Sequence, residues 1–183
     1  MVEIRPTALD GVMEIRPSRY GDDRGFFSET WSRKSLSEAG LNHDFVQDNH
    51  SMSGAKGVLR GLHFQVPPVA QVKLVRVSRG AIFDVAVDVR RGSATFGRWV
   101  GVELSEDAWN QLLIPSGFAH GFVTLVEHCE VQYKVTSPYA PEAERGIRWD
   151  DPDLAIDWPI REGLTLSDKD RSAPFLRDID TGF

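Results

Sequence analysis

The stretch Gly57–Val77, "GVLRGLHFQVPPVAQVKLVRV", predicts two short apolar strands separated by a pair of prolines. Both strands carry polar side chains, namely Arg60, His63 and Lys73, at places where a fully buried strand has valine or leucine. Burying such groups is costly unless they are paired or face a polar space. The stretch therefore predicts strands that wall a polar cavity.

Short alternating or apolar runs recur along the rest of the chain, and Gly, Pro, Asp or Ser separates most of them. Ten or more short strands with turns at this spacing predict an all-β sandwich or jelly-roll barrel. Helix is predicted in two short peripheral segments. One is "SRKSLSEAGL", with Ser32 as the N-cap and Gly40 as the stop, and the other is "LSDKDRSAPFL" near the end of the chain.

Composition limits the classes of function. A chain of 183 residues, 41% of them hydrophobic, can bury a sizeable core, and we predict one domain over residues 1–183. The net charge of −6 argues against nucleic acid as a partner, because phosphate binding needs a basic surface. No apolar run has the length of a membrane span or signal peptide, so no membrane partner is expected. Cys129 is the only cysteine and cannot form an intrachain disulfide, which predicts a cytoplasmic protein.

Strand alternation places several polar side chains on inward faces. In "EVQYKVT", Tyr133 shares a face with two valines, and in "VKLVRV" Lys73 does the same. Arg60 and His63 have opposite parity in a regular strand. A bulge at Gly61 would turn both toward one side, and we state that bulge as a hypothesis.

Two further runs offer polar groups at alternate positions. "FVQDNHS" places Gln47 and Asn49 on one face, and "GFFSETW" places Phe27, Glu29 and Trp31 on one face. Several strands are therefore expected to direct polar groups into a common interior.

The histidines do not predict a metal site. The chain has five histidines and no His-x-His pair, which metal sites in small barrels usually use. In "IPSGFAHGF", a turn at Pro115 and Gly117 is expected to place His120 at the start of the next strand. His63 and His120 alone would make a poor site, so we predict no metal and no other cofactor.

The order of the motifs is more specific than any one of them. The chain carries "LRGLHFQ", "QVKLVRVSRGAIFDVAVDVR", "IPSGFAHGF", "YKVTSPYAPEAERGIRWDDPDLAIDWP" and "LSDKD". With these motifs it closely resembles the dTDP-4-dehydrorhamnose 3,5-epimerase family, from "YGDDRGFFSETW" to "LSDKD". The resemblance implies a cupin-like jelly roll that needs no metal and generally works as a homodimer. It also implies inversion of the two carbons that flank the 4-keto group of dTDP-4-dehydro-6-deoxy-D-glucose.

The resemblance also implies roles for individual residues. His63 of "RGLH" is the base, Asp170 of "DKD" is its partner, and Tyr133 of "YK" is the acid. Lys73 of "KLV" and Arg60 of "LRG" lie at the reacting sugar and phosphates. The other positions that match substrate contacts of the family are Arg24, Phe27, Glu29, Gln47, Asn49, His120, Glu144 and Lys169.

The chemistry asks for such residues independently. Removing a hydrogen next to a ketone needs a base and a positive group beside the carbonyl oxygen, and inversion needs a separate acid on the other side of the ring. Histidine, with an ordinary pKa of about 6.5, suits the first task, and a phenol suits the last. Three alternatives stay open: a mono-epimerase that inverts one carbon for an antibiotic-type sugar, a non-catalytic sugar-binding cupin, and a metal-dependent cupin oxygenase.

Overall fold

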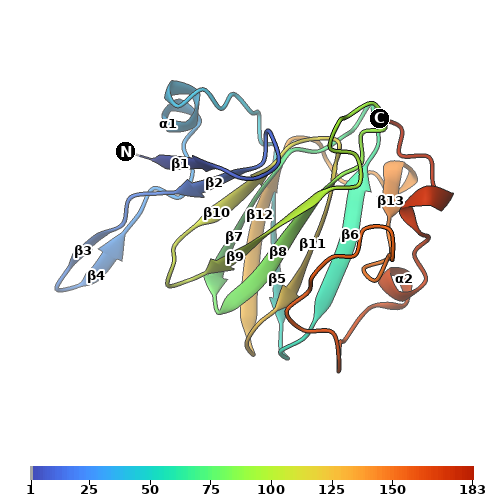
Figure 1. Cartoon of the computed structure of the whole chain (residues 1–183). Helices are drawn as coiled ribbons and strands as arrows, with labels where there is room; N and C mark the ends of the chain where they lie inside the picture. Colours follow the sequence, from blue (N-terminus) through green and yellow to red (C-terminus); the bar gives the residue numbers. More distant parts are fainter. Residues whose placement is uncertain (1) are drawn as a thin grey trace.

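The computed structural model describes residues 2–183 and shows two antiparallel sheets that face each other (Figure 1). The six-stranded sheet has the order β1 (Glu3–Pro6), β2 (Met13–Arg16), β10 (Gln111–Ile114), β7 (Lys73–Arg79), β12 (Cys129–Val135) and β5 (Gln47–Ser53). The five-stranded sheet has the order β13 (Glu144–Gly146), β6 (Leu59–Gln65), β11 (Phe118–Thr124), β8 (Ala81–Asp88) and β9 (Trp99–Ser105). The predicted all-β, cupin-like jelly roll is confirmed.

A separate hairpin and a few short helices complete the chain. The hairpin consists of β3 (Tyr20–Asp22) and β4 (Gly25–Phe27), and Figure 1 shows it projecting away from the barrel, on the side opposite to β6 and α2. The α-helices are α1 (Arg33–Glu38) and α2 (Asp168–Arg171), and 3-10 turns span Pro141–Ala143 and Leu176–Asp178. Both helices lie where the sequence predicts them.

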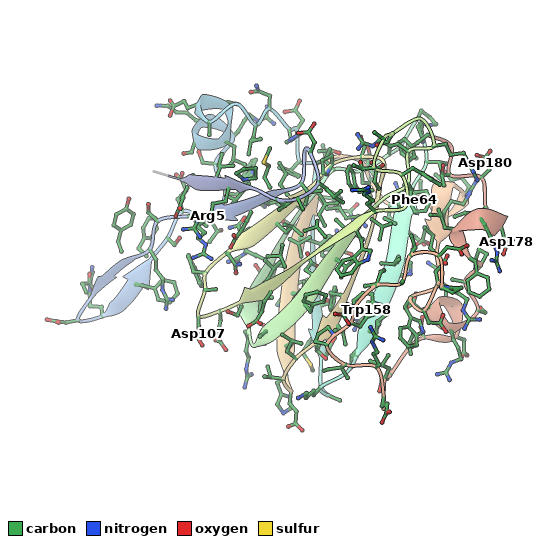
Figure 2. All side chains as sticks on the ribbon, in the orientation of Figure 1. Arg5, Phe64, Asp107, Trp158, Asp178 and Asp180 are labelled. Carbon is green, nitrogen blue, oxygen red and sulfur yellow. The ribbon has the colours of Figure 1, made fainter. Side chains whose placement is uncertain are left out.

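Three clusters of buried side chains hold these layers together. The first lies between the two sheets and includes Val75, Leu112 and Phe122. The second lies on the outer face of the five-stranded sheet, where the C-terminal segment covers it; Phe64 and Trp158 belong to it (Figure 2). The third packs α1 against the outer face of the six-stranded sheet. At one end of the space between the sheets the side chains are polar, and the cavity described below opens there.

Two glycines, Gly61 of β6 and Gly121 of β11, lie in close contact where the register between these two strands shifts. Gly61 has a φ of +117°, and a Cβ there would lie 2.6 Å from the Cα of Gly121. Arg60 pairs with Phe122 and His63 pairs with His120, so two residues of β6 face one residue of β11. The predicted bulge at Gly61 is thus confirmed, and it lets both Arg60 and His63 face the space between the sheets.

The structure corrects two local predictions. The strand in "GFFSETW" ends at Phe27, because Ser28 bonds the carbonyl of Ser18 and Ser32 then caps α1. Phe27, Glu29 and Trp31 therefore do not share a strand face. The strand that follows the turn at Pro115 and Gly117 begins earlier than predicted, at Phe118, so His120 lies inside β11 and not at its start.

Candidate active site

A cavity of about 530 Å³ opens between the two sheets. Its volume is in the range of sites for small organic ligands. Six of the residues that the sequence analysis selected line it: Arg60, His63, Lys73, His120, Tyr133 and Asp170. These side chains come from β6, β7, β11, β12 and α2, which are distant in sequence. The prediction that the polar residues of Gly57–Val77 wall a cavity is confirmed.

His63 and Asp170 form a close pair at this cavity. The Nε2 atom of His63 lies 2.5 Å from Oδ1 of Asp170, and Ser167 caps α2 by accepting a bond from the backbone N–H of Asp170. Burial acts to raise the pKa of Asp170, but the hydrogen bond and charge of His63, together with hydrogen bonds from Ser167 and the backbone of Gly61, hold the pKa below its usual range. With Nε2–H donating to the carboxylate, Nδ1 is left as the acceptor of a proton.

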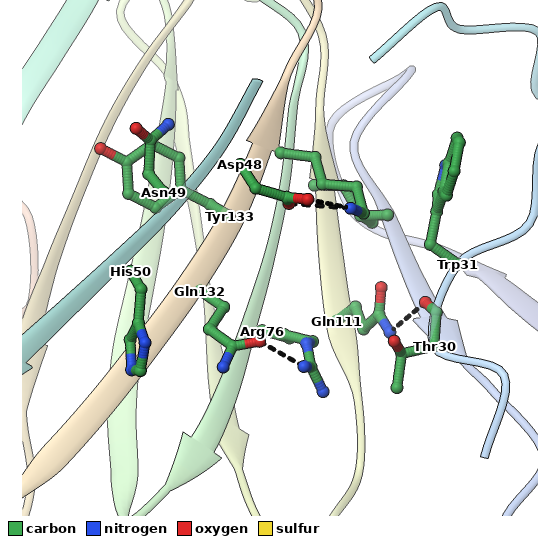
Figure 3. A pocket seen from close by; sticks show the side chains of 11 residues that line it. Thr30, Trp31, Asp48, Asn49, His50, Arg76, Gln111, Gln132 and Tyr133 are labelled. Carbon is green, nitrogen blue, oxygen red and sulfur yellow. Dashed lines mark hydrogen bonds and ion pairs between the residues drawn. The ribbon is translucent and has the colours of Figure 1, made fainter. Parts of the chain in front are cut away.

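Tyr133 enters the cavity from the other sheet. It pairs with Asn49 of β5, and Figure 3 shows both side chains pointing away from the polar pairs on the outer face of the sheet. Burial raises the pKa of the Tyr133 phenol. The phenol therefore stays protonated near neutral pH and can donate a proton.

Lys73 is the buried positive group of the cavity. Only 8% of the residue is exposed, and its Nζ atom donates to the backbone carbonyl of His63 at 3.2 Å. Burial lowers the pKa of Lys73 to about 8, although Asp84 and Glu144 act to raise it. The ammonium thus reaches from the six-stranded sheet to the five-stranded sheet and remains mostly charged at pH 7.

A second histidine–aspartate pair lies deeper. The Nε2 atom of His120 is 2.6 Å from Oδ1 of Asp84, and Asp84 is fully buried on β8. Burial lowers the pKa of His120, and the charge of Asp84 opposes this effect. The sequence analysis missed Asp84, although the signal was present. Asp84 shares an inward strand face with Ile82 and Ala86 in "AIFDVAVDV".

Four other predicted residues form a connected group beside the cavity. Gln47 donates to Asn49 at 2.8 Å, and Nζ of Lys169 lies 2.5 Å from the carboxylate of Glu144. Tyr139, which the sequence analysis also missed, joins the two pairs. Its hydroxyl donates to Glu144 at 2.8 Å, and its backbone N–H donates to Gln47 at 3.3 Å. No periodic pattern pointed to Tyr139, because it lies in a loop.

The structure does not bring Arg24, Phe27 and Glu29 to the cavity of their own chain. Arg24 pairs with Asp22 at the tip of the β3–β4 hairpin, and Phe27 is 70% exposed. Glu29 accepts a bond from Ser35 at 2.7 Å, at the start of α1. Figure 1 shows the hairpin on the far side of the barrel from α2.

The outer face of the six-stranded sheet carries a smaller hollow of about 340 Å³. Figure 3 shows its polar pairs, Asp48 with Lys134 and Arg76 with Gln132, and the bond from Gln111 to the carbonyl of Thr30. These groups are paired with one another. The inner cavity is the better candidate for catalysis, because it holds a histidine–carboxylate pair, a phenol and a buried cation together.

Within residues 2–183, no three His, Cys, Asp or Glu side chains are grouped so that they could hold a metal ion. None of the helices in that range has the length and apolar character needed to cross a lipid bilayer.

A family model and curated relatives identify the family of this chain. A model of the family described as dTDP-4-dehydrorhamnose 3,5-epimerase matches residues 6–178. The chain belongs to this family. A curated dTDP-4-dehydrorhamnose 3,5-epimerase of Pseudomonas aeruginosa is 53% identical over 174 residues, which cover 94% of this chain and 95% of the relative.

Solved structures of family members are equally similar. The 3,5-epimerase of Legionella pneumophila, in complex with dTDP-4-keto-L-rhamnose, has a TM-score of 0.94 at 50% identity and covers 98% of this chain and 95% of that chain. The dTDP-4-dehydrorhamnose 3,5-epimerase of Bacillus anthracis, with TDP and pyrophosphate bound, has a TM-score of 0.92 at 48% identity and covers 96% of this chain and 99% of that chain. The predicted family and enzyme class, an isomerase that acts as a sugar epimerase, are confirmed.

Proposed function

We propose that this chain converts dTDP-4-dehydro-6-deoxy-D-glucose to dTDP-4-dehydro-L-rhamnose by inverting carbons 3 and 5 of the sugar. The observation that carries the proposal is the placement of a base and an acid on opposite walls of one cavity. His63 comes from the five-stranded sheet and Tyr133 from the six-stranded sheet, and both line the cavity. A ring bound between the sheets would present one face to each.

The first step removes a proton. Nδ1 of His63 takes the hydrogen from the carbon next to the ketone, and the electron pair of the broken C–H bond moves to the carbonyl oxygen. Asp170 stabilises the imidazolium that forms. Lys73 stabilises the enolate oxygen, because its ammonium is already held in place by the carbonyl of His63 and needs little reorganisation.

The second step returns a proton from the other face. The Tyr133 hydroxyl delivers its proton to the carbanionic carbon, the ketone re-forms, and the configuration is inverted. Solvent then restores the proton of Tyr133 and removes that of His63, so the same pair can act at the second carbon. The remaining cavity and rim residues hold the nucleotide and sugar in this proposal: Arg60, His120, Gln47, Asn49, Glu144 and Lys169.

The active enzyme is a homodimer in this proposal. The family pattern assigns Arg24, Phe27 and Glu29 to the substrate, yet they lie away from the cavity of their own chain. The exposed hairpin with Phe26 (51% exposed) and Phe27 (70% exposed) is an apolar surface that a second copy would cover. These residues would then reach the cavity of the partner. The unpaired, buried Cys129 is consistent with a reducing cytoplasm as the compartment.

The test follows the sugar hydrogens by proton NMR in deuterated water. Wild-type protein should exchange the hydrogens at carbons 3 and 5 and yield the L-rhamno product. His63→Ala should abolish exchange, and Tyr133→Phe should retain exchange but impair inversion. His50→Ala is the matched control, because His50 pairs with Glu130 and lies on the outer face of the sheet. Exchange at one carbon only would overturn the double inversion in favour of a mono-epimerase, and binding without exchange would overturn catalysis.

A further inference from the structure

The fully buried Asp84 carboxylate is left over once the proposed mechanism has been assigned. Asp84 is 0% exposed on β8. Its Oδ1 atom binds His120, while within residues 2–183 no group hydrogen bonds to its Oδ2 atom. A buried carboxylate with an unsatisfied oxygen is expensive, so a protein retains one only where something compensates it or uses it.

The compensating charge is on the facing sheet. Lys73 is the only lysine or arginine within residues 2–183 that is buried. Its Nζ atom donates to the backbone carbonyl of His63. His63 lies opposite His120 in the β6–β11 ladder, and His120 is the residue that Asp84 binds. Asp84 also acts electrostatically on both Lys73 and His120. The ammonium and the carboxylate thus form one buried group of opposite charges around a neutral histidine.

We propose that Asp84 is a positioning residue of the reaction: its carboxylate orients the ring of His120 and supplies the buried negative charge that keeps Lys73 protonated beside the substrate. The carboxylate of Asp84 accepts a hydrogen bond from the Nε2–H of His120, which leaves Nδ1 of His120 as an acceptor. An acceptor of this kind suits a hydroxyl group of the sugar. Asp84 itself touches no reacting atom and acts through these two neighbours.

The protonation of Lys73 depends on every charged or titratable group that faces it. Burial lowers the pKa of Lys73 to about 8, and Asp84 and then Glu144 oppose this. Without Asp84, the pKa of Lys73 would fall further and the ammonium would lose its proton near neutral pH. The groups around the cavity are Arg60 and His63 of β6, Asp84 of β8, His120 of β11, Tyr133 of β12, Glu144 of β13 and Asp170 of α2.

The first measurement is the titration of Lys73 in the full-length, substrate-free protein, by NMR of 13Cε-labelled lysine, with the signal assigned from Lys73→Met. In Asp84→Asn the midpoint is expected at least one pH unit below that of the wild type. Asp84→Glu, which retains the charge, should restore most of the shift. Asp88→Asn is the matched control, because Asp88 is also fully buried on β8 but binds Arg90, Ser93 and Thr95. An unchanged midpoint in Asp84→Asn would overturn the proposal.

The second measurement uses thermal unfolding at pH 6, where Lys73 is charged. Lys73→Met leaves the charge of Asp84 uncompensated, and Asp84→Asn leaves the charge of Lys73 uncompensated. The fall in Tm of the double variant should therefore be smaller than the sum of the falls of the two single variants, by roughly 2–8 °C. If Asp84→Asn does not fold, the double variant should. Additive losses, or a double variant that also fails to fold, would overturn the proposal.

Only the kinetic part of this inference rests on the proposed role of Lys73 in the reaction. In Asp84→Asn the alkaline fall of kcat/KM should move to lower pH together with the titration of Lys73, while the acidic limb stays in place. A titration that moves while the alkaline limb does not would overturn the kinetic part of the inference. Neither the titration nor the unfolding cycle needs turnover, so a failure of the proposed epimerase activity and a failure of this inference are separately visible.

Discussion

Two histidine–aspartate pairs, which differ in depth and in origin, place a histidine in the cavity wall. The side chain of His63 is 29% exposed, and its partner Asp170 comes from α2, 107 residues further along the chain. The side chain of His120 is 9% exposed, and its partner Asp84 lies on the neighbouring strand β8. The two histidines face each other across the β6–β11 ladder.

The difference leads us to expect that a carboxylate partner alone does not make a catalytic base. A base must reach the substrate and must tolerate a positive charge when it takes the proton. Burial lowers the pKa of His120 and thus opposes its protonation, and Lys73 and His63 add to that effect. His63 is more exposed, and its charged form has an almost fully buried carboxylate beside it. We therefore expect the first pair to perform the chemistry and the second to bind and orient.

The largest expected effect separates these two roles directly. His63→Asn should lower kcat for proton exchange by about 10³–10⁴-fold, because general base catalysis is removed. His120→Asn should raise KM and lower kcat/KM by about 10-fold, the effect of one hydrogen bond of about 1.4 kcal/mol. Steady-state kinetics with exchange measured by NMR will separate the two. Equal losses of kcat in both variants would contradict the division of roles.

The next effect tests the partner of the base. Asp170→Asn should lower kcat by roughly 10²–10⁴-fold, because the amide of asparagine neither stabilises the imidazolium of His63 nor selects the tautomer with Nδ1 free. The affinity for dTDP, measured by calorimetry, should change little. Asp168→Asn, two residues before Asp170 and exposed to solvent, is the control. A variant that keeps normal kcat would remove Asp170 from the mechanism.

Strand alternation was sufficient to predict much of this site. Tyr133 and Lys73 share inward faces with valines. Gln47 and Asn49 share one face of β5, as the period of two requires. The same rule also places Asp84 on an inward face, but a single carboxylate in an apolar run does not by itself indicate a functional residue. The rule is local, and it works where a strand is regular on both sides.

Other parts of the site depend on packing that no local pattern contains. The pairing of Asp170 with His63 is set by a one-turn helix, whose position follows from the way in which the C-terminal segment covers the five-stranded sheet. Tyr139 lies in a loop, where there is no period to read. The run after Phe27 looked like a strand, yet hydrogen bonds of Ser28 and Ser32 end the strand and begin α1.

A smaller effect tests the backbone that aligns the two pairs. Gly61→Ala should destabilise the protein by roughly 2–3 kcal/mol, because its φ of +117° is unfavourable for a side chain and its Cβ would meet the backbone of β11 at 2.6 Å. Gly92→Ala is the control, since a Cβ there meets no atom within 4 Å, and it should stay within about 0.5 kcal/mol of the wild type. Denaturant unfolding measures both. Equal stability of the two variants would show that β6 and β11 can separate without cost.

The smallest effect contrasts Asp84 with Asp88, which lies on the same face of β8. Every oxygen of Asp88 has partners: Arg90 binds both, and Ser93 and Thr95 bind Oδ2. Burial acts to raise the pKa of Asp88, but these hydrogen bonds outweigh it and hold the pKa far below its usual range. A carboxylate satisfied in this way has a structural role, whereas the unsatisfied oxygen of Asp84 marks a charge that acts on its neighbours.

The sign of the pH dependence follows from that lowered pKa. As the pH falls, the unfolded chain takes up a proton at Asp88 near the ordinary pKa of about 3.9, while the folded protein does not. The contribution of Asp88 is therefore complete above about pH 5 and is lost as the pH falls through 4 and below. Asp88→Asn should cost on the order of 1–2 kcal/mol at pH 7 and progressively less in acid, as measured by urea unfolding between pH 3 and 7. Asp157→Asn, at a side chain that is 83% exposed, should show no such convergence. If the curves of wild type and Asp88→Asn stay parallel down to pH 3, the hydrogen bonds around Asp88 do not depend on its charge, and its contrast with Asp84 disappears.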